Sequence, residues 1–227
     1  ADAVIAHCDY AAGLARRLFF RAENLWVIPH GHFIDVFPNE MSREESRGRL
    51  EIPEAAFVYL FFGNARTYKG IERLIEAFRK VAGGDALLVL MMRRSFNPAY
   101  TEEIERLAAQ DGRVRIFTSS FFSNEEFQVY LNAADVVVLP FVDVLTSGSA
   151  ITALSFGRPV ILPGLGCLPE LIDETMGLLY DPVGAGGLEE ALVEIRKRDL
   201  EAAGRAAFAR ARALDWDGIA SRVAEVY

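Results

Sequence analysis

The sequence predicts an α/β fold in which a parallel sheet is covered by helices on both faces. Short apolar runs such as Phe57 to Phe62 and Asp135 to Leu139 have the length and the residue types of strands that are buried on both sides. Between such runs, apolar residues recur at helical spacing, as they do from Ile71 to Phe78. Because strand and helix patterns alternate across most of the chain, we expect parallel strand–helix–strand units.

The first residues form a small group of elements ahead of a linker. We predict a buried strand at Ala3 to His7, a helix at Tyr10 to Phe20 and a second strand at Leu25 to Ile28. The segment from Pro29 to Pro38 contains two prolines and a glycine and shows no helical period, which is typical of a linker. We therefore predict that residues 1–28 are the end of a preceding unit and that residues 29–227 form the main domain.

The main domain is predicted to begin with a short helix. Ser42 starts it, Glu45 completes a capping box three residues later, and Pro53 closes it. The other predicted strands are Ala86 to Met92, Val114 to Phe117, Pro159 to Leu162 and Gly177 to Tyr180, and the other predicted helices are Thr101 to Gln110, Asn124 to Ala133, Leu188 to Arg198, Glu201 to Ala213 and Asp215 to Tyr227.

The composition limits the classes of partner. Of the 227 residues, 52% are hydrophobic, which supplies the core of a globular domain. A net charge of -8 argues against nucleic acid as the main partner, because binding to a phosphate backbone requires a basic face. No apolar run has the length of a membrane span and no signal peptide is visible, so we predict a cytoplasmic protein. The absence of an initial methionine suggests a piece of a longer protein.

Cysteines and histidines give little sign of a metal site. Cys8 and Cys167 lack metal-ligand spacing, and we expect them to be reduced structural thiols. With three histidines in all, we predict no metal centre. His30 and His32 in the linker have two readings, as acid–base residues lining a cleft or as local hydrogen-bonding residues. We assign no role to His7.

Two turns between a predicted strand and a predicted helix carry groups that suit a phosphate. Thr146, Ser147, Gly148 and Ser149 follow the strand at Asp135 to Leu139, and hydroxyls and glycine at a helix start can bind an anion. The alternative is an ordinary hydroxyl N-cap.

The second turn, NARTYKG at positions 64–70, carries Arg66 and Lys69 after the strand that ends at Gly63. Two cations in this position are suited to a bound diphosphate. The alternative is a solvated basic turn.

The order of the motifs resembles the C-terminal donor-binding domain of the group 1 (family 4-like) glycosyltransferases. The motifs are FFGNARTYKG at 61–70, DVVVLP at 135–140, TSGS at 146–149, FGRP at 156–159 and GCLPE at 166–170. The resemblance covers Trp26 to Tyr227. It implies a Rossmann-like donor domain of the two-domain GT-B architecture, in which residues 1–28 end the acceptor-binding domain.

The resemblance also implies roles for residues. Arg66 and Lys69 match the basic pair that stabilises the leaving nucleoside diphosphate, and Phe122, like its neighbour Phe121, borders the nucleobase unless it is a core residue. The remaining implied donor-binding residues are Gly63, Asn64, Asp143, Thr146, Ser147, Gly148, Ser149 and Thr152. Glu170 begins a short predicted helix, where a carboxylate complements the helix dipole.

Two features depart from the family pattern. Two glutamates that commonly flank the second turn fall on Val144 and Thr152, so we expect Asp143 to contact the sugar and Thr152 to bond weakly to the ribose. The basic residue that often follows the glycine of the first turn is Asn64 here.

The implied reaction is transfer of a sugar, of hexosyltransferase type, from a nucleoside diphosphate sugar to a saccharide or a lipid-linked glycan. No DxD metal signature is present, so we expect metal-independent transfer with no cofactor besides the donor substrate. This chain by itself is expected to be inactive or weak, with peripheral membrane association through the acceptor domain. The alternatives are a non-catalytic nucleotide-binding or assembly module of the same fold and a nucleotide-sugar epimerase.

Overall fold

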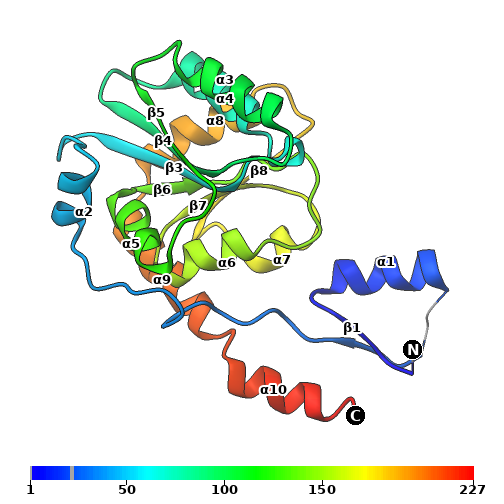
Figure 1. Cartoon of the computed structure of the whole chain (residues 1–227). Helices are drawn as coiled ribbons and strands as arrows, with labels where there is room; N and C mark the ends of the chain where they lie inside the picture. The colour runs from blue at the N-terminus through cyan, green and yellow to red at the C-terminus, as the bar shows by residue number, and fades with distance from the viewer. Residues whose placement is uncertain (1, 21–22) are drawn as a thin grey trace.

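The computed structural model describes residues 2–20 and 23–227, and within them six strands form one parallel sheet in the order β5-β4-β3-β6-β7-β8 (Figure 1). These strands are β3 (Phe57–Asn64), β4 (Ala86–Arg93), β5 (Val114–Ser119), β6 (Val136–Val138), β7 (Val160–Pro163) and β8 (Gly177–Tyr180). Helices α3, α4 and α8 cover one face, and α5 and α6 cover the other. The predicted α/β, Rossmann-like fold is confirmed.

The helices follow the strands in alternation. Their bounds are α1 (Asp9–Phe19), α2 (Arg43–Arg49), α3 (Ile71–Val81), α4 (Pro98–Ala108), α5 (Asn124–Ala133), α6 (Gly148–Ser155), α7 (Leu168–Leu171), α8 (Gly187–Glu194), α9 (Leu200–Arg212) and α10 (Trp216–Ala224), with 3₁₀ turns η1 (Thr67–Lys69) and η2 (Ile195–Lys197). The helix expected at Leu188 to Arg198 ends earlier, since its last turn is η2. Helix α4 starts earlier than predicted because Pro98 suits the first helical turn.

The strand order reverses between β3 and β6, which is where open parallel sheets commonly bind ligands. From β3, the chain proceeds outward to β4 and β5, whereas β6, β7 and β8 extend the sheet in the opposite direction. At such a reversal, the loops after the two central strands diverge and leave a crevice at the carboxyl ends. The two turns that carry the predicted phosphate-binding residues follow β3 and β6, so the fold brings them to the same edge of the sheet.

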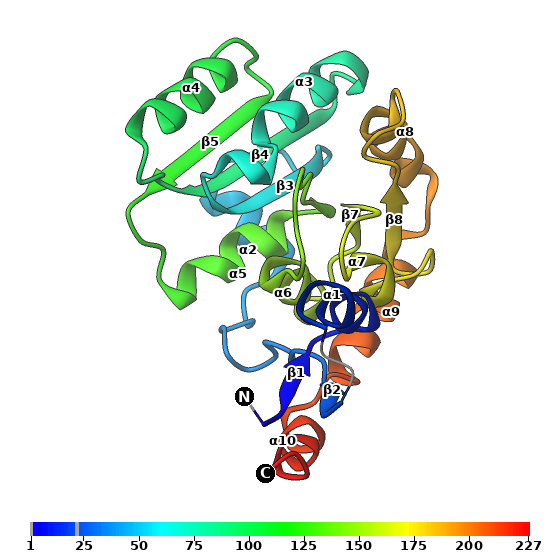
Figure 2. The same cartoon turned by 90° about the vertical axis from the view of Figure 1, so that its right-hand side faces the viewer.

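Strands β1 (Val4–Ala6) and β2 (Leu25–Val27) form a separate parallel pair with α1 between them (Figure 2). As predicted, the segment from Pro29 to Pro38 contains no helix or strand. It is nevertheless held in place, since His32 N–H donates to Leu214 O at 2.9 Å and Trp216 Nε1 donates to His32 O at 2.8 Å. The division at residues 28 and 29 stays a prediction, and residues 1, 21 and 22 of the first unit lie outside the described residues.

The expectation of reduced thiols is wrong in this structure. Cys8 and Cys167 form a disulfide, with their Cα atoms 5.9 Å apart and a sequence separation of 159 positions. Cys8 is the N-cap of α1, and Cys167 immediately precedes α7. The pairing depends on tertiary contact between distant segments, which is why the spacing of the cysteines gave no indication of it.

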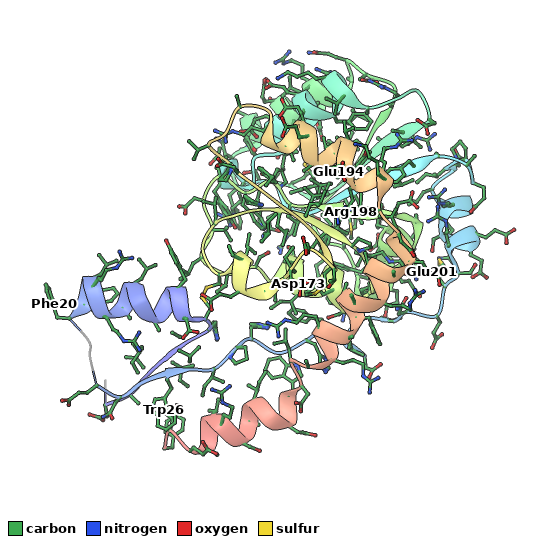
Figure 3. All side chains as sticks on the ribbon, turned by 180° about the vertical axis from the view of Figure 1, so that it is seen from behind. Phe20, Trp26, Asp173, Glu194, Arg198 and Glu201 are labelled. Atoms are coloured by element: carbon green, nitrogen blue, oxygen red, sulfur yellow. A yellow bond between two sulfur atoms is a disulfide. The ribbon has the colours of Figure 1, made fainter. Side chains whose placement is uncertain are left out.

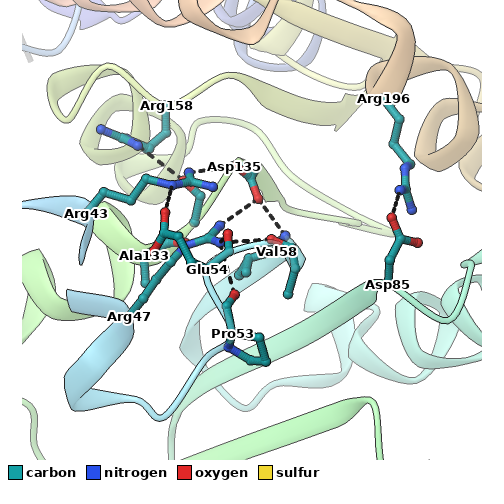
Figure 4. Close-up of polar contacts among 12 residues, drawn as sticks. Arg43, Arg47, Pro53, Glu54, Val58, Asp85, Ala133, Asp135, Arg158 and Arg196 are labelled. Atoms are coloured by element: carbon teal, nitrogen blue, oxygen red, sulfur yellow. Dashed lines mark hydrogen bonds and ion pairs between the residues drawn. The ribbon is translucent and has the colours of Figure 1, made fainter. Parts of the chain in front are cut away.

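A buried ion pair fixes α2 to the amino ends of β3 and β6 (Figure 4). Arg47 has a 1% exposed side chain, and its Nη2 donates to Asp135 Oδ2 at 2.9 Å. The same carboxylate accepts from Arg43 Nη1 at 2.7 Å and from Val58 N–H at 2.7 Å. Arg47 also donates to the carbonyls of Ala133 and Ala56. Because each charge has several partners, the cluster anchors the start of the main domain.

We expect Asp135→Asn to lower the free energy of unfolding by roughly 3 kcal/mol, because the buried Arg47 charge loses its counter-charge. Guanidinium unfolding measures the change. The matched control is Asp85→Asn, which breaks the more exposed pair with Arg196 and should have little effect (Figure 4). Equal losses in the two variants would contradict this assignment.

No helix among the described residues is long and apolar enough to cross a membrane.

Candidate functional site

The loops after β3 and β6 touch at their backbones. Val142 N–H donates to Tyr68 O at 2.9 Å. Gly70 has φ +65°, and a Cβ built on it would overlap the carbonyl oxygen of Pro140. Only glycine allows both this backbone conformation and this close approach. The contact fixes the position of Lys69, which directly precedes Gly70.

Lys69 is largely buried without a counter-charge. Its Nζ lies 4.4 Å from the centroid of the Phe141 ring, which is 1% exposed, and 5.4 Å from that of Tyr68. Within residues 2–20 and 23–227, it forms no hydrogen bond or ion pair. Burial lowers the pKa of Lys69 to about 8, because the charged ammonium is desolvated. A cation held in this way is ready to pair with an anion.

The ammonium faces a glycine and a hydroxyl. A Cβ built on Gly63 would lie 3.9 Å from Lys69 Nζ and 3.7 Å from Ser149 Oγ. Gly63 has φ +142°, which favours glycine, and its lack of a side chain leaves this space open. The structure therefore brings Gly63, Lys69 and Ser149 together, as the two turns predicted.

The turn after β6 is also the start of α6. Ser147 is its N-cap, and Ser147 Oγ accepts from Ala150 N–H at 3.1 Å. The first backbone N–H groups of a helix have no intrahelical acceptor and carry partial positive charge. The hydroxyl of Ser147 is thus an ordinary cap, as in the alternative interpretation, while Gly148 and Ser149 supply first-turn amides and Ser149 Oγ lies beside the Gly63 position that Lys69 also faces.

The other predicted residues of the second turn lie at the edge of the site. Asp143 and Thr146 are exposed, on the loop between β6 and α6. Thr152 is buried, and its Oγ1 donates to Gly148 O at 2.9 Å. That hydrogen bond commits the hydroxyl proton of Thr152 to α6, so the group offers a ligand only acceptor capacity.

Arg66 lies apart from Lys69. Its guanidinium is 5.3 Å from the centroid of the Phe96 ring, which is 89% exposed. Arg66 is exposed and forms no ion pair among the described residues. The structure thus places the two members of the predicted basic pair on one loop without bringing their charges together.

A cavity adjoins Gly63 at the carboxyl ends of β3 and β4. Its volume is about 270 Å³, and its lining includes Gly63, Asn64, Phe121, Phe122 and Arg93. Phe122 packs edge-on against Tyr130, with ring centroids 5.9 Å apart, which favours the core interpretation. Its neighbour Phe121 is 67% exposed.

Sequence reasoning missed Arg93, whose Nε donates to Ser120 O at 2.8 Å. The sequence feature that could have identified Arg93 is its position as the first charged residue after the apolar run of β4.

The GCLPE segment at residues 166–170 contacts the backbone of the second turn. Cys167 N–H donates to Leu145 O at 2.8 Å, and a Cβ on Gly166 would overlap the carbonyl oxygen of Val144. Glu170 lies in the first turn of α7, as predicted, and it also complements the start of a second helix. Its carboxylate accepts from Asp9 N–H at 2.8 Å and from Tyr10 N–H at 2.7 Å, the first amides of α1.

Both linker histidines form a local hydrogen bond, as in the second reading, and His30 Nδ1 donates to Gly31 O at 2.7 Å. His32 Nδ1 accepts from Ile34 N–H at 3.2 Å, which is the local role. His30 lines a cavity of about 360 Å³ together with His7, Thr146, Ser147 and Glu170. Within the described part of the chain, no group of histidine, cysteine or acidic residues is arranged to hold a metal ion.

Comparisons with known proteins agree with this architecture. Residues 56–198 match the family model described as Glycosyl transferases group 1. A GDP-mannose:glycolipid 4-beta-D-mannosyltransferase from Xanthomonas campestris pv. campestris is 29% identical over 160 residues, covering 70% of this chain and 40% of the relative. A D-inositol 3-phosphate glycosyltransferase from Streptomyces scabiei is 27% identical over 239 residues, covering 100% of this chain and 54% of the relative.

Solved structures show the same fold. Sucrose-phosphate synthase from Thermosynechococcus elongatus superposes with a TM-score of 0.84 at 28% identity, over 100% of this chain and 58% of that protein. Anabaena HepE, in complex with UDP, has a TM-score of 0.88 at 20% identity, over 99% of this chain and 63% of HepE. The chain thus spans about half the length of the curated relatives it matches. Since the family model matches more than half of the 227 residues, the chain belongs to the group 1 glycosyl transferases.

Proposed function

We propose that this chain is the donor-binding part of an enzyme that transfers a sugar from a nucleoside diphosphate sugar to a hydroxyl acceptor. The observation that carries the proposal is the largely buried Lys69 ammonium, which contacts aromatic rings but forms no hydrogen bond or ion pair among the described residues, and which faces Gly63 and Ser149. Burying a cation without a partner destabilises a protein. A diphosphate between Lys69 and the start of α6 offsets that cost.

The same groups suit the chemical step. When the bond between the sugar and the diphosphate breaks, negative charge develops on the departing phosphate oxygen. The Lys69 ammonium and the first-turn amides of α6 are fixed before the reaction, so they stabilise this charge without reorganising. Arg66 is exposed on the same loop and supplies a second cation when its side chain turns from Phe96 toward the phosphates. This arrangement requires no metal ion.

We assign the nucleobase to the cavity beside Gly63. The cavity shares Gly63 with the Lys69 site and lies along the carboxyl ends of β3 and β4, so a nucleoside joined to a diphosphate at Lys69 could occupy it. Phe121 offers an exposed ring for stacking, whereas Phe122 packs into the core. Asp143 is assigned to the sugar hydroxyls and Thr152 to the ribose, from their places on either side of the α6 start.

The acceptor is proposed to be a saccharide or a lipid-linked glycan. The names of two relatives support a hydroxyl acceptor, since one acts on a glycolipid and the other on D-inositol 3-phosphate. We place the reaction in the cytoplasm, at the membrane face, with peripheral attachment through the acceptor-binding part. This chain by itself is expected to bind nucleotide and to transfer sugar weakly or not at all.

The binding proposal is tested by thermal unfolding with UDP, GDP, ADP and dTDP in turn. A nucleotide present at a hundred times its dissociation constant stabilises the folded state by about 2.7 kcal/mol. We expect one member of the panel to stabilise the protein most. Lys69→Met should weaken that binding by roughly 10- to 100-fold, because a charge-assisted hydrogen bond is lost. Unchanged affinity in this variant would overturn the site assignment.

Lys69→Met should also stabilise the unliganded protein. Because the pKa of Lys69 is lowered to about 8, the unfolded chain binds more protons than the folded chain between about pH 8 and pH 10.5. The cost of burying the charge is therefore present at pH 7 and disappears as the pH rises through this window. We expect the variant to gain roughly 1 to 3 kcal/mol at pH 7 and almost nothing at pH 10.5.

Urea unfolding at the two pH values measures this gain. The matched control is Lys80→Met, which replaces an exposed lysine paired with Glu189 and should bring no gain at pH 7. A Lys69→Met variant that is less stable than the parent protein at pH 7 would contradict the burial argument.

The two neighbouring phenylalanines provide a separate test. Phe121→Ala should weaken nucleotide binding by about tenfold, since a stacked aromatic contributes roughly 1 to 3 kcal/mol, and should leave the stability unchanged. Phe122→Ala should lower the free energy of unfolding by roughly 2 kcal/mol or more, because its ring packs against the core. Calorimetric titration and urea unfolding distinguish the two effects. If Phe122→Ala weakened nucleotide binding and Phe121→Ala lowered the stability, the nucleobase would instead lie on Phe122.

A further inference from the structure

The disulfide joins the first elements of the chain to the loop that supports the donor site. Cys8 ends the turn between β1 and α1, and Cys167 lies between β7 and α7. Figures 1 and 2 place the α1 ribbon next to α7, and the sulfur–sulfur bond is the covalent link between them (Figure 3). The link is separate from the peptide connection through residues 29–38.

The hydrogen bonds beside the disulfide are weaker links. Glu170 accepts from the amides of Asp9 and Tyr10, and these contacts are exposed to solvent. Solvent-exposed polar contacts contribute little to stability, whereas a covalent bond holds two segments at a high effective concentration. The far end of α1 extends into solvent, with Phe20 90% exposed (Figure 3). Arg222 donates to Val27 O and so ties β2 to α10, but the contacts that join α1 itself to the α7 segment are those of Glu170 and the Cys8–Cys167 bond.

Cys167 is coupled to the second turn through the backbone. Its N–H donates to Leu145 O, and the neighbouring Gly166 leaves no space between its Cα and the carbonyl oxygen of Val144. Ser147, the N-cap of α6, follows two residues after Leu145. A constraint on Cys167 is thus transmitted to the segment that forms one side of the proposed diphosphate site.

The sulfur atoms are reached from a cavity. Cys8 is 6% exposed and Cys167 is 8% exposed, and both line the 360 Å³ cavity between the first elements and the α6 start. A small dithiol can enter this cavity and reach sulfur atoms that are otherwise buried. In the cytoplasmic location proposed above, disulfides are typically transient and redox-responsive rather than permanent.

We propose that Cys8–Cys167 is a reversible redox site that locks β1, α1 and β2 against residues 143–149 when oxidised and releases them when reduced. A dithiol reductant attacks one sulfur as a thiolate, forms a mixed disulfide and displaces the second cysteine sulfur. Its other thiol then displaces the first. Two electrons and two protons pass to Cys8 and Cys167, which become thiols, and the reductant becomes a disulfide.

The first experiment establishes the oxidised state. The protein is purified without reductant and then denatured in the presence of N-ethylmaleimide, which labels free thiols. Its mass is measured by intact mass spectrometry. We expect no maleimide adduct in the untreated protein. We expect two adducts in protein that was treated with dithiothreitol while folded. Two adducts without dithiothreitol, or none after it, would overturn the proposal.

The second experiment measures the release by hydrogen exchange with and without dithiothreitol. Reduction should speed exchange of the amides in residues 4–19 by roughly tenfold or more and should also speed exchange in residues 142–149. Amides of β3 and β4 should be unchanged, which shows that the domain remains folded. Unchanged exchange in residues 4–19 of the reduced protein, or in residues 142–149, would contradict the coupling.

The matched variant is Cys8→Ser with Cys167→Ser. Cys8 Sγ accepts from Ala11 N–H as the N-cap of α1, and serine preserves a cap acceptor while removing the covalent link. This variant should exchange rapidly with or without dithiothreitol. A response to dithiothreitol in the variant would show that the reductant acts elsewhere. Because thiols and amides are the readouts, failure of this proposal is distinguishable from failure to bind nucleotide.

Discussion

The close approach of two loops, after β3 and after β6, is the constraint on which the site depends. Gly70 lies against the Pro140 carbonyl, and Val142 bonds to Tyr68, so Lys69 is held over the buried ring of Phe141. The position is unfavourable for an unpaired ammonium, and the six-stranded core tolerates it. A site that is costly without its ligand gains most when the ligand arrives, which is the physical sense in which it is preorganised.

The sequence was informative where a local pattern determines the structure. Parallel strands buried on both faces appear as continuous apolar runs, so β3 and β4 were predictable, and the glycine-rich turns marked the sheet edge where Lys69 and Ser149 meet. Contacts between distant segments leave no such pattern. The disulfide, the partner of Glu170 and the position of Arg93 beside Phe121 all depend on the folded arrangement, and β6 proved shorter than its apolar run.

The electrostatics of the site differ from those of the whole chain. The net charge is -8, yet the proposed ligand is an anion. Lys69, Arg66 and the start of α6 act over a few ångströms, and salt screens exposed charges beyond about 10 Å. Recognition therefore depends on short-range contacts more than on long-range attraction. The absence of carboxylates at Val144 and Thr152 adds to this local excess of positive charge.

Both ends of the described chain lie on one side of the molecule, where α10 passes close to the linker (Figure 1). Trp216 donates to His32 O, and its ring fills the space in which a side chain at Gly31 would lie. The linker at residues 29–38 and the segment around Leu214 are therefore in direct contact. A rotation of the first elements against the sheet would therefore have to break the contacts of Trp216 with the linker as well as the disulfide.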